Sequence, residues 1–175
     1  LSFIFVIVNR KYFKLKMKIA VFPGSFDPIT LGHESIVYRA LPLFDKIIIA
    51  VGQNIAKKNL FPLKKREGWI KKIFAEEKKI EIKIFDGLTV DFCKKVKATY
   101  ILRGLRTSAD FEFERTIAQM NKAMSAEVET IFIFSSPEFS AIKSTVVRDI
   151  ISHGGDVSKF VPSAIRKDCN KSSIF

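Results

Sequence analysis

The chain has 175 residues, 47% of them hydrophobic, which fits one domain with a sizeable core and excludes an intrinsically disordered chain. Two cysteines and two histidines are too few for a disulfide framework or a metal-binding cluster of those residues. The formal net charge of +12 at pH 7 leaves open a partner that is a nucleic acid, an anionic membrane surface or a polyanionic substrate.

Residues 1–16 combine an apolar run with a basic cluster that follows it. A secretory signal places its positive charges first, and this run is too short to span a bilayer. Because Met17 is a natural start for the first strand, we expect residues 1–16 to be a non-native or disordered extension and residues 17–175 to form a single domain. The alternative is a peripheral strand or an interaction segment. Nothing else is typical of a targeting or transmembrane element, which predicts a cytoplasmic protein.

The first clear element is the apolar run at residues 19–22, which predicts a buried strand. A loop follows, and Thr-Leu-Gly-His at residues 30–33 then opens a predicted helix with an apolar face. The first amides of a helix have no intrahelical partner and the macrodipole adds positive potential, so this end is an anion site. Gly32 would let a phosphate reach the backbone, and His33 could donate to a phosphoryl oxygen. The alternative is that Gly32 packs and His33 caps the helix.

The middle of the chain alternates strands and helices. Residues 46–51 form a continuous apolar run, typical of a strand buried on both faces of a parallel sheet, whereas the alternation at residues 80–85 indicates a strand nearer the sheet edge. Lys57 lies in the loop after the first of these strands. Thr89 lies where the next helix begins. Without further information, Lys57 is an exposed lysine and Thr89 is an N-terminal helix residue.

Residues 63–74 predict a helix with Trp69 on its apolar side. The opposite side is basic, and we expect it to be a solvated face formed by Lys64, Lys65, Arg66, Lys71 and Lys72. Because so much of the positive charge is explained in this way, the net charge alone does not require a nucleic-acid partner.

Residues 99–102 predict a short strand that runs into Arg-Gly-Leu-Arg at residues 103–106. Arg103 and Arg106 at the carboxyl end of a strand form a convergent cationic pair, and guanidinium forks suit phosphates. The acids Glu112 and Glu114 follow. By themselves they are acids in the first turns of a helix that complement its dipole.

Residues 129–134 predict the last clear strand, and after a loop the segment 141–149 predicts a helix. Ser144 or Thr145 can cap this helix, whose free amides again face anions. The polar tail from Asp168 is expected to be frayed. The alternation of strands and helices predicts a doubly wound α/β domain with a mostly parallel sheet of about five strands.

Three motifs resemble those of one family. Pro-Gly-Ser-Phe-Asp-Pro followed by Thr-x-Gly-His resembles the (H/T)xGH signature of the nucleotidyltransferases, and the whole string is similar to that of the phosphopantetheine adenylyltransferases. Arg-Gly-Leu-Arg at 103–106, with Asp-Phe-Glu-Phe-Glu at 110–114 and Met-Asn at 120–121, is a second match. Residues 141–148 resemble the ISSTxxR signature of the nucleotidyltransferase superfamily, except that Lys143 replaces the first serine. The resemblance covers residue 17 to about residue 164.

The resemblance implies a Rossmann-like enzyme of coenzyme A synthesis that transfers the adenylyl group of ATP to 4'-phosphopantetheine. It implies Mg2+ as cofactor, a homohexamer, and neither a nucleic-acid nor a membrane partner. His33 would be catalytic, and no residue is assigned as a metal ligand. The residues expected to bind ATP are Ser25, Phe26, His33, Gly104, Leu105, Arg106, Glu114, Phe139, Ser140, Ala141, Ile142, Lys143, Ser144 and Thr145. The residues expected to bind the acceptor are Ser25, Lys57, Thr89 and Arg103.

Two other functions stay open. One is another nucleotidyltransferase of the superfamily, acting on nicotinate mononucleotide or on a glycerol or choline phosphate, against which the Arg-Gly-Leu-Arg motif argues. The other is a basic nucleic-acid-binding protein, although the chain lacks an RNA-recognition motif and interleaved aromatic and basic residues. Lys143 also has two interpretations: its ammonium lies near the β- and γ-phosphates of ATP, or it points into solvent.

Overall fold

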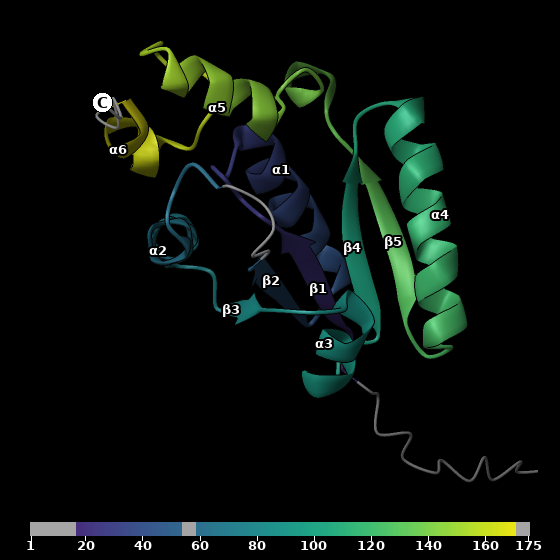
Figure 1. Ribbon diagram of the computed structural model, residues 1–175. Coiled ribbons are helices and arrows are strands. Elements are labelled where there is room, and N and C mark those ends of the chain that lie inside the picture. The colour runs from purple at the N-terminus through teal and green to yellow at the C-terminus, as the bar shows by residue number, and fades with distance from the viewer. Residues whose placement is uncertain (1–16, 54–58, 171–175) are drawn as a thin grey trace, which may run out of the picture.

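The computed structural model describes residues 17–53 and 59–170. Its five strands form one sheet in the order β3-β2-β1-β4-β5, and every neighbouring pair is parallel (Figure 1). The strands are β1 (Ile19–Gly24), β2 (Lys46–Gly52), β3 (Ile80–Phe85), β4 (Tyr100–Leu105) and β5 (Glu129–Phe134). The predicted doubly wound fold with about five strands is confirmed, and the alternating strand β3 does lie at an edge.

Six α-helices connect and cover the strands. They are α1 (Leu31–Ala40), α2 (Leu63–Ile73), α3 (Thr89–Lys95), α4 (Ser108–Met124), α5 (Ser144–Ser152) and α6 (Arg166–Asn170). Three short 3-10 helices, at Leu41–Leu43, Pro137–Phe139 and Ser163–Ile165, complete the described secondary structure. No helix among the described residues is both long and apolar enough to cross a membrane.

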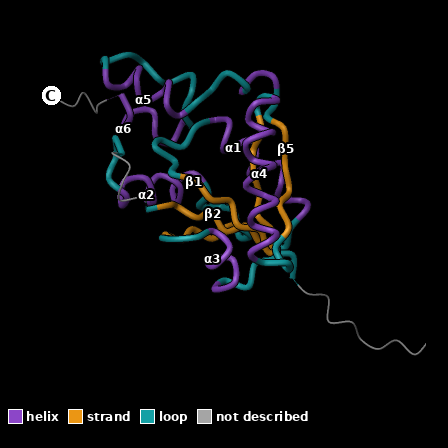
Figure 2. Tube along the Cα trace, turned by 45° about the vertical axis from the view of Figure 1, so that its right-hand side comes forward, coloured by secondary structure: helices purple, strands orange, loops and turns teal. Residues whose placement is uncertain are grey.

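The sheet has a hydrophobic core on each face, because successive residues of a strand point to opposite sides. In β1, Ala20 and Phe22 join the core that contains Ile36 of α1, whereas Val21 joins the core that contains Val90 of α3. Figure 2 shows helices on both sides of the strands. A strand buried on both faces reads as a continuous apolar run, which explains the sequences of β1 and β2.

Two expectations about the surface are wrong. Arg66 is only 2% exposed, so it is not part of the solvated face of α2. The chain from Asp168 to Asn170 is helical rather than frayed, since Cys169 is fully buried and the Trp69 indole donates to Asp168 at 3.1 Å. In both cases, contacts with distant segments decide the burial.

The strand order places β1 beside β4, and between these two strands the order in which the chain adds strands to the sheet reverses. From β1 the chain continues outward to β2 and β3, and it then returns to β4 and β5 on the other side. In an open parallel sheet, ligands bind at the carboxyl ends of the strands beside such a point. The fold therefore locates a candidate site beyond Gly24 and Leu105, which end β1 and β4.

Candidate functional site

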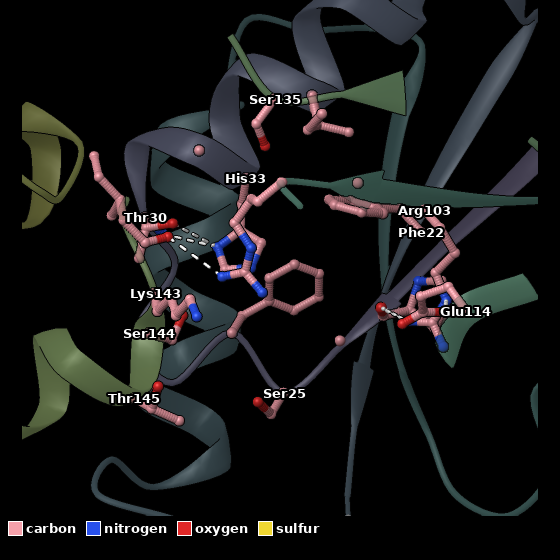
Figure 3. A pocket seen from close by; sticks show the side chains of 18 of the residues that line it. Phe22, Ser25, Thr30, His33, Arg103, Glu114, Ser135, Lys143, Ser144 and Thr145 are labelled. Carbon is pink, nitrogen blue, oxygen red and sulfur yellow. Dashed lines mark hydrogen bonds and ion pairs between the residues drawn. The ribbon is translucent and has the colours of Figure 1, made fainter. Parts of the chain in front are cut away.

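A cavity of about 400 Å3 lies at this point, within the size range of ligand-binding sites. The end of β1 and the loop after it form its floor, β4 forms one wall, and the N-termini of α1 and α5 form another. In Figure 3, Arg103 and Glu114 lie on one side of His33, and Lys143, Ser144 and Thr145 lie on the other. Segments far apart in the sequence thus meet around one polar space.

His33 is held at the N-terminus of α1 by Thr30. The backbone N–H of Thr30 donates to Nδ1 of His33 at 3.0 Å, and the Thr30 hydroxyl oxygen lies 2.9 Å from the same nitrogen. Because a backbone N–H can only donate, Nδ1 is the unprotonated nitrogen, and the ring proton of neutral His33 lies on Nε2. His33 therefore caps the helix with one nitrogen and has a donor on the other.

Burial, together with the positive charge of Arg106, lowers the pKa of His33 from 6.5 to about 4. The imidazole is consequently neutral at physiological pH. Edge-to-face packing of Phe26, whose ring centroid lies 5.2 Å from that of His33, contributes to the apolar surroundings. A neutral donor in such surroundings can stabilise negative charge that develops on an oxygen without carrying charge itself.

Gly32 lines the cavity, and the protein atoms around it leave room for a side chain. A Cβ at this position would lie 3.6 Å from its nearest protein atom, an ordinary contact distance. Packing against the protein therefore does not require glycine here, and a side chain would instead reduce the space for a ligand. Gly104 differs, because a Cβ there would approach Ile36 to 3.1 Å. Gly104 therefore allows β4 to pack closely against Ile36 of α1.

Three arginines line the cavity, and each contacts a carboxylate. Arg103 Nε lies 3.1 Å from Glu114, Arg106 Nε lies 3.1 Å from Asp110, and Arg148 Nη1 lies 3.6 Å from Asp27. Arg103 also donates to the carbonyl of Pro23 at 3.2 Å, which links β4 to β1. Ion pairs of this kind fix the positions of the guanidinium groups while leaving other N–H donors for a polyanion.

Lys143 also lines the cavity, and its side-chain ammonium makes no hydrogen bond or ion pair within the part of the chain that the structure describes. It occupies the N-cap position of α5 without a side-chain cap. The expectation that Ser144 or Thr145 caps this helix is wrong: both belong to its first turn, and the Ser144 hydroxyl donates to the Pro28 carbonyl at 3.0 Å. The first amides of α5 thus have no side-chain cap.

The structure places most of the predicted site residues around this cavity. Those that line it are Ser25, Phe26, His33, Arg103, Gly104, Arg106, Glu114, Ile142, Lys143, Ser144 and Thr145. Leu105 is buried in the sheet, and Phe139, Ser140 and Ala141 lie in and after the short helix before α5 without lining the cavity. Thr89 is the first residue of α3 and lies outside the lining. Lys57 lies outside the described residues.

Asp27, which the sequence did not single out as a site residue, is fully buried beside the site. Its carboxylate accepts hydrogen bonds from the backbone N–H groups of Leu60 at 2.8 Å and Phe61 at 2.9 Å. Arg148 donates to its carbonyl at 3.2 Å. An aspartate directly before a proline is typical of an ordinary turn, so no local signal in the sequence distinguished Asp27.

No metal cage is present among the residues that the structure describes, since no three His, Cys, Asp or Glu side chains are grouped to hold an ion. The acids next to the cavity, Glu114, Asp110 and Asp27, are each already in contact with an arginine. These residues therefore do not fit a metal site of their own, and none is assigned as a ligand.

Comparison with curated proteins places the chain among close relatives. It is 51% identical over 150 residues to the phosphopantetheine adenylyltransferase of Flavobacterium psychrophilum, covering 86% of this chain and 99% of that protein. It is 44% identical over 152 residues to that of Phocaeicola vulgatus, covering 87% and 100%. The corresponding protein of Clostridium perfringens is 43% identical over 158 residues, covering 90% and 96%.

A solved structure and a family model agree with the fold. The bifunctional NMN adenylyltransferase/ADP ribose pyrophosphatase of Francisella tularensis superposes with a TM-score of 0.70 at 16% identity, a likeness of fold alone. The match covers 89% of this chain, which spans about half of that bifunctional protein (49%). The family model described as cytidylyltransferase-like matches residues 21–150. With its relatives at 43–51% identity, the chain belongs to the phosphopantetheine adenylyltransferase family.

Proposed function

We propose that this chain transfers the adenylyl group of ATP to the phosphate of 4'-phosphopantetheine, which gives dephospho-coenzyme A and pyrophosphate. The observation that carries this proposal is the placement of His33. Its neutral imidazole, held by Thr30 at the N-terminus of α1, lies in the same cavity as Arg103 and Arg106. The acceptor follows from the relatives, which are named phosphopantetheine adenylyltransferases.

The reaction needs no general base from the protein. The second pKa of a phosphate monoester is about 6, so the attacking oxygen of the acceptor is already anionic at neutral pH. What the site must supply is the positioning of two polyanions that repel each other and the stabilisation of charge at the α-phosphate. The cavity offers cations and oriented donors for both tasks.

We assign His33 to the transition state, where the proton on Nε2 would donate to an oxygen of the α-phosphate. The uncapped amides at the start of α5, together with Lys143, would hold the rest of the triphosphate. Arg103, and Lys57 from the resemblance, would hold the phosphate of the acceptor. Breaking the bond between the α- and β-phosphates then leaves pyrophosphate, and the acceptor oxygen forms the new bond to the α-phosphorus.

A requirement for Mg2+ is part of the proposal and rests on the resemblance. Because the described residues provide no cage for it, the ion would bind through triphosphate oxygens and water, as Mg2+ commonly does at nucleotides. When bound, it would neutralise part of the charge of ATP. Titration of activity with Mg2+ at several ATP concentrations tests this. If the ion binds through the nucleotide, the Mg2+ concentration needed for activity should rise with the ATP concentration.

A cytoplasmic location is likewise a proposal, and so is assembly into a homohexamer, which rests on the resemblance. The exposed side of α4 is suited to contact a second copy. It presents Phe113, Met120 and Met124 at helical spacing, with 67%, 61% and 45% of each residue exposed. The mass measured by light scattering after gel filtration tests the assembly, and a monomer at micromolar concentration would contradict it.

The test of the proposed reaction is pyrophosphate release from ATP, measured with a panel of acceptors. We expect release with 4'-phosphopantetheine and none above background with nicotinate mononucleotide, glycerol phosphate or choline phosphate. Turnover with one of the other acceptors, and not with 4'-phosphopantetheine, would favour another nucleotidyltransferase of the same superfamily.

A further inference from the structure

Arg66 is the charged residue whose position is least expected. It belongs to the lysine-rich helix α2, yet it is only 2% exposed. A buried charge is retained only where its donors find acceptors. Nε of Arg66 donates to the Phe61 carbonyl at 3.0 Å, and Nη1 donates to the Ser25 carbonyl. Arg66 thus joins α2 to the loop that follows β1, 41 residues earlier in the chain.

The loop that Arg66 contacts has a strained backbone. Phe26 adopts a φ of 46°, in the left-handed region that non-glycine residues rarely occupy. Such conformations persist where surrounding contacts determine them, and they are common at functional sites. Here the Phe26 ring is buried against Phe22, with centroids 5.6 Å apart, while the Ser25 carbonyl is held by Arg66. Contacts on both sides of the strained residue therefore maintain its conformation.

The contact at the Ser25 carbonyl determines where the next amide points. This carbonyl and the N–H of Phe26 belong to one trans peptide unit, in which they point in opposite directions. Arg66 does not line the cavity, whereas Ser25 and Phe26 do. A carbonyl directed at Arg66 consequently turns the Phe26 N–H away from α2. Across the described residues, no acceptor for this N–H is found.

We infer that Arg66 is a positioning residue: by holding the Ser25 carbonyl, it directs the N–H of Phe26 into the cavity as a donor for a phosphoryl oxygen. The inference rests on the proposed function in taking phosphate as the ligand. A free, fixed amide next to His33 would add a second donor where charge develops. The planar guanidinium suits this role because its Nε and Nη1 reach two carbonyls at once, which a lysine ammonium does less rigidly.

Kinetics of Arg66→Lys and Arg66→Met test the inference, with Ile70→Ala as the control. Ile70 lies on the same helix and is fully buried, so its truncation destabilises the protein without removing the contact to Ser25. At a temperature where every variant is folded, both Arg66 variants should lower kcat by about tenfold to hundredfold, with the KM for ATP within about threefold. Ile70→Ala should keep kcat within about twofold. Equal effects of the Arg66 variants and Ile70→Ala on kcat would make Arg66 merely structural and overturn the inference.

A second measurement does not depend on turnover. The sequence contains only two Ser-Phe pairs, at residues 2–3 and 25–26, so labelling serine carbonyl carbons and phenylalanine nitrogens leaves two correlated amide signals. Addition of ATP without an acceptor should shift the Phe26 amide proton in the native protein, and much less in Arg66→Met. A Phe26 signal that does not respond to ATP, when other signals show that ATP is bound, would overturn the inference. An inactive protein whose Phe26 amide still responds would contradict the proposed function alone.

Discussion

Nδ1 of His33 lies 3.0 Å from the backbone nitrogen of Thr30, and this contact fixes the protonated nitrogen of the imidazole as Nε2. The Thr30 amide is an orphan donor that the helix start would otherwise leave unpaired. One hydrogen bond therefore caps α1 and prepares His33 as a donor. The capping contact and the proposed catalytic role of this histidine, which are alternatives in the sequence, are therefore compatible.

Replacement of His33 by alanine should lower kcat by about two to three orders of magnitude, the effect of losing one transition-state donor. Affinity for ATP should stay within a few-fold, because the cations and the start of α5 remain. Steady-state kinetics and equilibrium binding of ATP measure the two quantities. His153→Ala is the matched control, since this second histidine is exposed at the end of α5. Near-native turnover of His33→Ala would rule out the assigned role.

His33 should also make stability depend on pH. Its pKa is lowered from 6.5 to about 4 in the folded protein, so between these values the unfolded chain binds the additional proton. Stability is then fully present above pH 6.5 and falls as the pH decreases toward about 4. His33→Gln should remove this contribution and flatten the pH dependence of the unfolding free energy, measured by urea denaturation. Identical pH slopes for the two proteins would show that His33 titrates normally.

Arg103→Ala and Lys57→Ala should each raise the KM for 4'-phosphopantetheine much more than that for ATP. For Arg103 the reason is its place at the end of β4, where it lines the cavity. For Lys57, which lies outside the described residues, the resemblance alone supports the prediction. Initial rates with each substrate varied in turn measure the two constants. Parallel increases in both constants would count against acceptor binding.

Lys143→Ser should weaken ATP binding several-fold at low ionic strength, and the difference should close as salt is added. A partly exposed charge near a multivalent anion contributes on the order of 1 kcal/mol, and screening reduces this contribution. Calorimetric titration at two salt concentrations measures the effect. Lys72→Ser, on the exposed side of α2, changes the net charge equally and should leave ATP affinity unchanged. Unchanged affinity for Lys143→Ser at low salt would mean that Lys143 points into solvent.

A protein that begins at Met17 should fold and turn over normally, because β1 and the loop after it are complete from that residue. Circular dichroism, the melting temperature and kcat measure this. Precipitation or loss of activity would instead assign residues 1–16 to the core or to a contact between subunits.

The sequence predicted the features that depend on local pattern. Continuous apolar runs identified β1 and β2. The helix start predicted at residues 30–33 is confirmed, since Thr30 is the N-cap of α1 and His33 completes the cap. The parallel order of the strands then brought Arg103 to the same edge as His33, because carboxyl ends of parallel strands share one edge. Predicting these features requires only the periodicity of the sequence and the topology of a parallel sheet.

Features that depend on contacts between distant segments could not be predicted. Arg66 fits the basic face of α2 by spacing, and only the carbonyl of Ser25 explains its burial. Ser144 has the composition of an N-cap, yet its hydroxyl donates to Pro28, 116 residues earlier. Local propensity is a weak prior where a tertiary hydrogen bond competes with it.

The fate of the phosphorus atoms of ATP tests the central claim most directly. With ATP labelled at the α-phosphorus and 4'-phosphopantetheine as acceptor, the label should appear in dephospho-coenzyme A. With ATP labelled at the γ-phosphorus, it should appear in pyrophosphate. Label from the γ-phosphorus in the acceptor, or α-label that stays with free nucleotide while pyrophosphate is released, would contradict adenylyl transfer to 4'-phosphopantetheine.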